Sequence, residues 1–306
     1  MFKKNKFCLS TYRFLGVYLF LIIILFIFAC GSKSIEELEP AINQENETPE
    51  ATPPTYNLPN IDLSNWKVTL PIGNPTEVKP PEILNYATNE TLKPFMHNDS
   101  INGALVFYTY PGASTTNSSY SRTELREQMV PGSNNTNWKF SQGGNLKGEL
   151  SMASISKDNN GNYHRTIIMQ IHGRLTNEQR SLIGENDNNA PPMLKIYWVN
   201  GYVRVKTKVL KNLDADDTEI LYTNAWGDDD GYTYSEYVGF DKFTLEVKVS
   251  EGRMEVLMNG KSIVYNDIHI QKWGVFENYF KAGNYLSTTA ENSFSKVKYY
   301  KLEVSH

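Results

Sequence analysis

The chain has 306 residues, of which 40% are hydrophobic and 21% charged, and its formal net charge is −4. A nucleic-acid-binding protein carries a basic excess, so this acidic balance excludes nucleic acid as the expected partner. The only two cysteines, Cys8 and Cys30, lie near the N-terminus. The rest of the chain therefore forms neither disulfides nor Cys-based metal sites.

Residues 1–29 read as an export signal. Basic residues precede an apolar run from Phe14 to Phe28, which is short for a membrane span. The following Ile27-Phe28-Ala29-Cys30 resembles a bacterial lipobox, so we predict a lipoprotein signal peptide over 1–29 and a lipid on Cys30. A plain signal peptide or an N-terminal anchor is the alternative. Removing residues 1–29 takes away four basic and no acidic residues, which changes the net charge from −4 to −8.

Residues 30–57 read as an acidic, proline-rich tether with few apolar residues to bury. Its role would be to hold a domain away from a membrane. Gly31 and Ser32 after Cys30 show no Asp-type retention signal, and several glutamates follow them. We therefore expect the protein on the outer membrane of a bacterial envelope, facing outward, as a monomer.

Residues 58–306 have the texture of a β-domain, with short runs of Val, Ile, Tyr, Phe and Thr between turn residues. Asn200-Gly201 joins two such runs, 193–198 and 202–209, and predicts a hairpin. A second series is predicted at 243–249, 253–258 and 261–265, with Asn259-Gly260 as its last turn, and a terminal strand at 295–304. Residues 174–183 are the one short helix expected.

Many strands without helices between them predict an all-β fold. We expect an antiparallel two-sheet β-sandwich of the jelly-roll type, with a substrate groove on the concave face of one sheet. The expected flanking loops are residues 112–119, 176–190 and 224–234.

Three segments place polar side chains on alternate positions of a strand, and hence on one face. Arg122, Glu124 and Arg126 form the first set, Gln170 and His172 the second, and Tyr279, Lys281 and Tyr285 the third. Guanidinium groups pair bidentately with carboxylates, and a neighbouring cation favours a phenolate. Such a face suits an acidic, extended substrate. Each segment alone also has a purely structural explanation. The first could form cross-strand ion pairs, the second could hold a core histidine with its hydrogen bonds satisfied, and the third could be a tyrosine-rich packing face.

Together, the three segments carry a resemblance. Arg122-Thr123-Glu124-Leu125-Arg126, Gln170-Ile171-His172 and Tyr279-Phe280-Lys281-Ala282-Gly283-Asn284-Tyr285 resemble, in this order, the marker segments of the alginate lyases of polysaccharide lyase family 7. The resemblance covers residues 58–306 and implies a β-jelly roll. The family usually has Gln two residues after the last Tyr, where this chain has Ser287, which puts one substrate contact in doubt.

The resemblance implies β-elimination from a uronate polymer, without a metal or an organic cofactor. Arg122 and Gln170 would neutralise the C6 carboxylate, with Arg126 as a second candidate. His172 and Tyr285 would divide the proton transfer: Tyr285 alone on mannuronate, His172 as base and Tyr285 as acid on guluronate. Glu124 would orient the arginines, Lys281 would lower the pKa of Tyr285 or bind a neighbouring uronate, and Tyr279 would contact substrate.

Two finer expectations concern the mode of cutting. Ile171 stands where the family has Ile or Val, and Ile is associated with guluronate-containing blocks, so a guluronate preference is expected. We also expect cutting inside the polymer, which leaves a 4,5-unsaturated uronate at the non-reducing end of each new fragment.

Two other function classes compete with a lyase. A jelly-roll glycoside hydrolase needs paired carboxylates, but Glu-x-Asp-x-x-Glu does not occur; after Glu185-Asn186-Asp187, Ala190 stands at the place of the second Glu. A non-catalytic alginate-binding surface lipoprotein would keep the basic face, the tether and the lipid. It would have no need for the full set of Arg, Gln, His and Tyr.

Overall fold

The computed structural model describes residues 59, 61–115 and 117–306. The predicted signal peptide, Cys30 and the whole of the predicted tether lie outside these described residues. None of the helices in the described ranges combines the length and the apolar character that crossing a bilayer requires.

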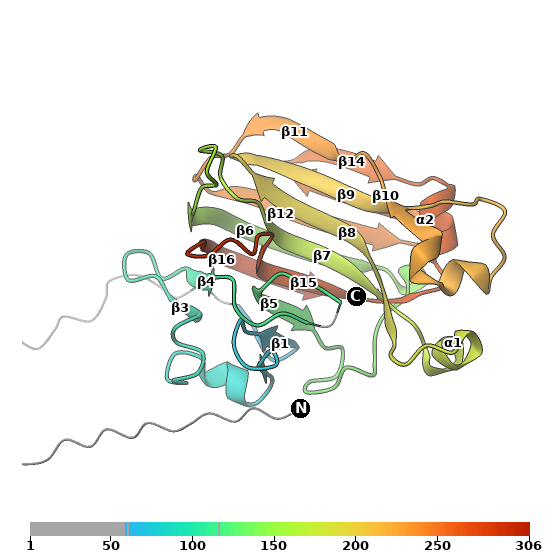
Figure 1. Ribbon diagram of the computed structural model, residues 1–306, viewed down its shortest axis with the longest axis horizontal. Helices are drawn as coiled ribbons and strands as arrows, with labels where there is room; N and C mark the ends of the chain where they lie inside the picture. The colour runs from blue at the N-terminus through green and yellow to red at the C-terminus, as the bar shows by residue number, and fades with distance from the viewer. Residues whose placement is uncertain (1–58, 60, 116) are drawn as a thin grey trace, which may run out of the picture. The chain divides into compact units, whose positions relative to one another are not determined.

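Two antiparallel sheets make up the domain, which confirms the predicted all-β sandwich (Figure 1). The first sheet has nine strands in the order β10-β9-β8-β7-β15-β5-β1-β2, with β11 pairing β9 as well. Its strands are β1 Trp66–Thr69, β2 Glu77–Val78, β5 Arg122–Glu127, β7 Thr166–Arg174, β8 Asn189–Val199, β9 Tyr202–Leu210, β10 Trp226–Asp228, β11 Tyr232–Tyr237 and β15 Glu277–Leu286.

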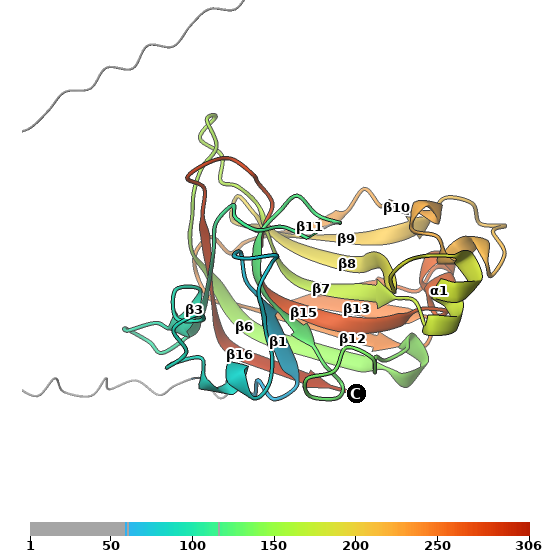
Figure 2. The same ribbon diagram turned by 60° about the horizontal axis from the view of Figure 1, so that its bottom comes forward.

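The second sheet has seven strands in the order β14-β13-β12-β6-β16-β4-β3. They are β3 Met96–Asn98, β4 Leu105–Thr109, β6 Gly144–Ile155, β12 Phe243–Ser250, β13 Arg253–Met258, β14 Lys261–Tyr265 and β16 Ser295–Ser305. In both sheets a late strand inserts between two early ones: β15 between β5 and β7, and β16 between β4 and β6. Figure 2 shows β15 next to β7 and β16 next to β6. Such long-range pairing is typical of jelly rolls.

The core lies between the two sheets and follows the period-two alternation of the strands. In β12, for example, Phe243, Leu245 and Val247 are buried while the residues between them are half-buried or exposed. Large rings fill the interior, among them Trp66, Trp138, Trp198, Trp273, Phe107, Phe280 and Tyr299. Burial of this apolar surface is the main stabilising term of the fold.

The predicted hairpins are confirmed. β8 and β9 meet at Asn200 and Gly201, which have φ values of 47° and 86°; β13 and β14 meet at Asn259 and Gly260, at 48° and 80°. Two positive φ angles define the type I′ turn, whose twist matches that of the strands. The terminal strand β16 begins at the predicted Ser295 and ends one residue later than predicted.

Three predictions of local structure need correction. The helix predicted at 174–183 begins only at Asn177 (α1, Asn177–Ile183), because Thr176 and Gln179 form a capping box there and Arg174 belongs to β7. The predicted loop 176–190 therefore contains α1, and the predicted loop 224–234 contains β10 and the start of β11. A second helix, α2 (Ile268–Trp273), was missed, although Asp267 caps it by accepting from two backbone N–H groups. Short 3-10 turns lie at Glu82–Asn85, Phe140–Gln142, Glu219–Leu221 and Thr223–Ala225.

The imidazole of His306 contacts the buried carboxylate of Glu127. Its Nε2 lies 2.6 Å from Oε1 of Glu127, whose side chain is 2% exposed, and its ring packs on Trp138 and Phe280. The other Glu127 oxygen accepts from Trp138 Nε1 and from the Phe280 N–H, both at 2.9 Å. Although burial opposes it, the bond to Glu127 raises the pKa of His306 above its usual range.

This pair predicts a pH-dependent contribution to stability. A raised pKa in the folded state means that the contribution is fully present below the unfolded pKa of about 6.5 and is lost as the pH rises through the higher folded value. His306→Ala should lower the free energy of unfolding by roughly 1–3 kcal/mol in mildly acidic buffer and by less in alkaline buffer. Urea unfolding at both pH values measures this. An equal loss at both would contradict the assignment.

Candidate active site

The strand register brings the three polar segments together. β15 pairs on one side with β5, where Tyr285 lies opposite Arg122 and Lys281 opposite Arg126. On its other side β15 pairs with β7, where Tyr279 lies opposite His172 and Lys281 opposite Gln170. All eight predicted side chains therefore belong to one face of three adjacent strands, which we call the polar face. It comprises Arg122, Glu124, Arg126, Gln170, His172, Tyr279, Lys281 and Tyr285.

The intervening residues explain why this face points away from the core. Leu125, Ile171, Phe280 and Ala282 alternate with the polar residues and are fully buried in the sandwich. β15 also bulges against β7 between Ala282 and Tyr285. Gly283 in this bulge has φ 134°, and a Cβ there would lie 2.8 Å from the Thr123 carbonyl oxygen, so the position requires glycine.

Glu124 is the centre of the polar contacts. Its side chain is 1% exposed and forms an ion pair with Lys281, accepts from Gln170 Nε2 at 2.5 Å, and lies 3.4 Å from Arg122 Nη1. Of the two arginines that Glu124 is predicted to orient, it contacts Arg122, whereas the guanidinium of Arg126 has other partners. Glu124 instead holds the amide of Gln170 and the ammonium of Lys281.

Arg126 makes a separate group with Tyr279 and His172. Its guanidinium donates to the Glu127 carbonyl at 2.8 Å and to Asn137 Oδ1 at 2.8 Å, and it stacks 4.0 Å from the centroid of the Tyr279 ring. The Tyr279 ring in turn stacks on His172 with an interplanar angle of 9°. His172 Nδ1 lies 2.9 Å from the Gly173 carbonyl, which leaves Nε2 as the ring nitrogen without a hydrogen-bond partner among the described residues.

Tyr285 lies under a different cation from the one predicted. The guanidinium of Arg122 is 3.9 Å from the centroid of its ring, whereas Lys281 is paired with Glu124. The Tyr285 hydroxyl also forms a short hydrogen bond with the hydroxyl of Ser118, a residue of the loop before β5. Burial raises the pKa of Tyr285, and the groups that act in the opposite direction are Arg122 and Ser118 rather than the predicted Lys281.

Burial shifts the pKa of several of these groups. It lowers the pKa of His172 to about 3, with Lys281 as the next cause, so the imidazole is neutral. Burial also lowers the pKa of Lys281 to about 8 against the opposing effect of Glu124. The pKa of Tyr285 is raised, because burial outweighs the opposing effects of Arg122 and Ser118. The expectation that a neighbouring cation lowers the pKa of Tyr285 below its ordinary value is therefore wrong.

The neutral state of His172 makes a testable prediction. The pH dependence of kcat/KM reports groups of the free enzyme. With a pKa of about 3 for His172, the acid limb of cleavage should show no inflection near about 6.5, the ordinary imidazole value. Initial rates on the expected uronate polymer across the acidic range check this. An acid limb at the ordinary imidazole pKa would contradict the lowered pKa of His172.

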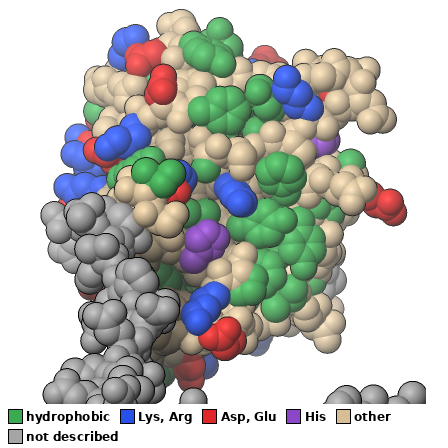
Figure 3. All heavy atoms as spheres, turned by 90° about the vertical axis from the view of Figure 1, so that its left-hand side faces the viewer, with side chains coloured by type: hydrophobic (Ala, Val, Ile, Leu, Met, Phe, Trp, Pro, Cys, Tyr) green, Lys and Arg blue, Asp and Glu red, His purple; other side chains and the backbone are tan. Residues whose placement is uncertain are grey.

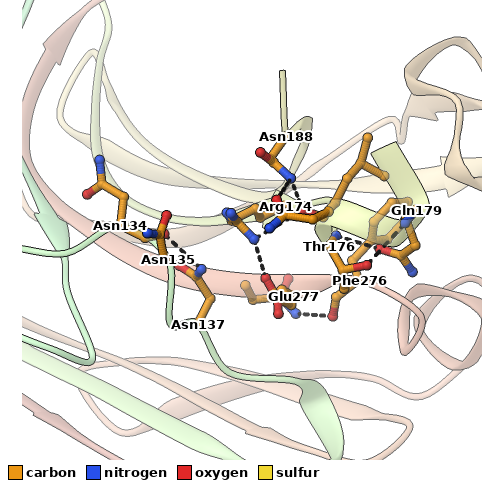
Figure 4. Close-up of polar contacts among 12 residues, drawn as sticks. Asn134, Asn135, Asn137, Arg174, Thr176, Gln179, Asn188, Phe276 and Glu277 are labelled. Atoms are coloured by element: carbon orange, nitrogen blue, oxygen red, sulfur yellow. Dashed lines mark hydrogen bonds and ion pairs between the residues drawn. The ribbon is translucent and has the colours of Figure 1, made fainter. Parts of the chain in front are cut away.

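Two residues at the end of the polar face were missed, although each continues the period-two pattern by one step. Arg174 follows His172 on β7, and its Nη1 lies 2.5 Å from Oε2 of Glu277, which precedes Tyr279 on β15. Figure 4 shows this pair beside Asn188 and the Thr176–Gln179 cap of α1. Asn188 Nδ2 and Arg174 Nη1 both donate to the Leu175 carbonyl. These contacts fix the loop after β7 against β15.

Two hollows are present, and neither is lined by residues of the polar face. One of about 630 Å³ is lined by Asn74, Pro75, Glu77, Ser114 and Thr115, at the β2 edge of the nine-stranded sheet. The other, of about 340 Å³, is lined by Pro94, His97, Tyr108, Phe294 and Lys296, on the seven-stranded sheet. The end of the domain that faces left in Figure 1 has hydrophobic side chains beside cationic ones (Figure 3). Among the described residues, no group of three His, Cys, Asp or Glu side chains is placed to hold a metal ion.

Comparison with known proteins decides the family. The family model described as "Alginate lyase" matches residues 61–306. The chain belongs to this alginate lyase family. Its fold is that of the family 7 alginate lyases, and the chain is a polysaccharide lyase. Among curated proteins, no sequence matches this lyase significantly.

Solved structures of family 7 alginate lyases share its fold. Alginate lyase A1-II', as a His-to-Asn and Tyr-to-Phe double variant in complex with substrate (GGMG), is 27% identical, with a TM-score of 0.63 over 81% of this chain and 94% of that one. The Tyr-to-Phe variant in complex with product (GGG) is 26% identical, with a TM-score of 0.65 and coverage of 81% and 97%. An alginate lyase from Corynebacterium sp., 22% identical with a TM-score of 0.55 over 80% and 96%, shows the shared fold alone.

Proposed function

We propose that this lyase cuts alginate by β-elimination at the polar face, through Arg122, Gln170, His172 and Tyr285. The observation that carries the proposal is the strand register, which sets these four side chains on one face of β5, β15 and β7. The proton at C5 of a uronate is weakly acidic, and its removal creates a dianionic, enolate-like species. Stabilising that charge is the main electrostatic task of such a site.

Arg122 and Gln170 are the proposed partners of the C6 carboxylate. Arg122 has one long contact to Glu124, at 3.4 Å, and so keeps donors for a substrate carboxylate. Arg126, the second candidate, is occupied by the Glu127 carbonyl and Asn137. Gln170 is held by Glu124, which orients its amide. This contrast in partners favours Arg122 for the reacting sugar and leaves Arg126 and Lys281 to neighbouring uronates.

His172 and Tyr285 are the proposed proton-transfer groups. On mannuronate, where the C5 proton and the O4 leaving group lie on one side of the ring, Tyr285 would take the proton as a phenolate and return it to O4. On guluronate they lie on opposite sides, so neutral His172 would be the base and Tyr285 the acid. The relative solved with substrate has a His and a Tyr replaced, which supports assigning the chemistry to these residue types.

A preference for guluronate and cutting inside the polymer belong to the same proposal. Ile171 is fully buried in the core, so a preference for guluronate would act through the backbone that carries Gln170 and His172. Cutting inside the polymer is supported by cations on both sides of the polar face, with Lys67 on β1 and Lys195 on β8 in register with Arg126 and Gln170. The anchor on Cys30, the outer-membrane location and the monomeric state rest on the sequence.

Ultraviolet absorbance tests the proposal. The domain of residues 58–306 is incubated separately with polyguluronate and polymannuronate; elimination creates a double bond conjugated with the carboxylate, and hydrolysis does not. Absorbance should rise faster on polyguluronate, with an early fall in viscosity if cuts are internal. Folded protein that binds alginate without any rise would favour the binding lipoprotein instead.

A further inference from the structure

Ser118 stands out because it is the hydrogen-bond partner of the Tyr285 hydroxyl among the described residues. It belongs to the loop between β4 and β5, in a segment that carries none of the family's marker residues. Its side chain is half-buried, while the next residue, Ser119, is exposed. The two adjacent serines therefore differ in one respect that matters here: only Ser118 contacts Tyr285.

The loop holds Ser118 in place by its own backbone contacts. The Ala113 N–H donates to the Pro71 carbonyl at 2.8 Å, and the Gly112 N–H donates to Ser121 Oγ at 2.7 Å, which ties down the two ends of the loop. Nearer the tip, the Ser118 N–H donates to the Thr115 carbonyl at 3.0 Å. Ser118 is thus fixed by a turn rather than by Tyr285 alone.

Either hydroxyl can donate in the hydrogen bond between Ser118 and Tyr285 while Tyr285 is protonated, and ionisation of Tyr285 fixes the direction. Ser118 Oγ accepts the backbone N–H of Tyr120 at 3.1 Å. A serine hydroxyl has one proton to give, and here its remaining partner is the Tyr285 oxygen. A phenolate only accepts, so once Tyr285 is ionised Ser118 must be the donor, and a hydrogen bond to a charged oxygen is the stronger kind.

We propose that Ser118 is a positioning residue of this lyase, which fixes the Tyr285 hydroxyl and donates to it in the phenolate form. The inference rests on the proposed function and adds a residue to it. Ser118 and Arg122 contact different parts of Tyr285. The Arg122 guanidinium lies over the face of the ring, 3.9 Å from its centroid, and the Ser118 hydroxyl forms a hydrogen bond with the phenolic oxygen. Tyr120 packs edge-on against the same ring at 6.4 Å.

The test uses the pH dependence of kcat/KM on two polymers. Without the Ser118 donor the phenolate loses stabilisation, so the pKa of Tyr285 should rise by about one unit. Polymannuronate needs the phenolate, so in Ser118→Ala its ascending limb should move up by that amount, with roughly tenfold lower activity below the limb. Polyguluronate needs the protonated phenol, so its descending limb should move up and its activity at high pH should increase. A general folding defect would lower both.

The other groups that act on the pKa of Tyr285 are the same in the parent protein and in the Ser118 variants, so they do not contribute to a difference between them. The charged and titratable groups that act on it are Arg122, Glu124, Tyr120 and Tyr197, and Lys281 titrates nearby with a pKa of about 8. Ser119→Ala, which alters only the exposed neighbour, should leave both limbs in place. Ser118→Thr keeps the hydroxyl and should restore the parent profile.

The outcomes separate this inference from the proposed function. If the parent protein cuts neither polymer, the function itself fails. If the parent cuts alginate and Ser118→Ala keeps both limbs unshifted, Ser118 has no role in positioning Tyr285. Equal losses on both polymers, without a shift, would reduce Ser118 to a structural residue of the loop.

Discussion

Tyr285→Phe should lower the rate of alginate cleavage by about 10²–10⁴-fold, the usual contribution of a general acid–base group. The substitution removes one hydroxyl and keeps the ring, which continues to pack under Arg122 and against Tyr120. Because Arg122, Gln170 and Lys281 keep their partners, the affinity for alginate should remain. Initial rates of unsaturated product and calorimetric titration with alginate measure the two quantities.

A matched control is Tyr237→Phe, which removes a hydroxyl from a tyrosine that is 61% exposed on β11. It should leave the cleavage rate unchanged. Undiminished cutting by Tyr285→Phe would show that the mechanism proposed here is wrong, and loss of binding together with cutting would show that the hydroxyl serves to hold substrate.

Glu124→Gln should have the largest effect on stability. The substitution leaves Lys281, whose side chain is 8% exposed, without its counter-charge. Removal of one partner of a buried ion pair typically costs about 3–5 kcal/mol. Arg122 and Gln170 also lose the carboxylate that orients them, and a misplacement of about 1 Å can cost roughly 10²-fold in rate. Urea unfolding and the absorbance assay measure both losses.

Two variants make the test of Glu124 specific. Glu303→Gln breaks an exposed pair with Lys301, in which both side chains are about half exposed, and should change stability by less than about 1 kcal/mol. The double variant Glu124→Gln/Lys281→Met removes both buried charges and should recover most of the stability of the single variant, without recovering activity. A single variant as stable as the parent would contradict the central place of Glu124.

Local signals in the sequence predicted much of the fold. Asn-Gly dipeptides fix hairpin turns by their own φ preferences, and period-two alternation marks a strand wherever one face is buried. Hence β13 and β14 have the predicted bounds. Which strands lie next to one another is a long-range matter: β15 pairs with β5, more than a hundred residues earlier, and no local pattern encodes that neighbour.

In the site, too, local patterns predicted which face a side chain lies on but not which partner it contacts. Alternation alone put Glu124 and Lys281 on one face, but their pairing depends on how far each side chain reaches across two strands. Arg126 has the same position relative to Glu124 as Arg122, yet Asn137 and the Glu127 carbonyl draw its guanidinium away. Ser118 was missed because it lies in a loop, where no periodicity indicates the direction of a side chain.

The bulge in β15 sets the spacing between His172 and Tyr285, the two groups proposed to transfer the proton. In a regular ladder, side chains on one face stand at fixed steps along and across the strands. β15 advances three residues, from Ala282 to Tyr285, while β7 advances two, from Met169 to Ile167. Tyr285 therefore stands off that lattice relative to His172. The offset between the two groups proposed to transfer the proton is thus set by the backbone of β15.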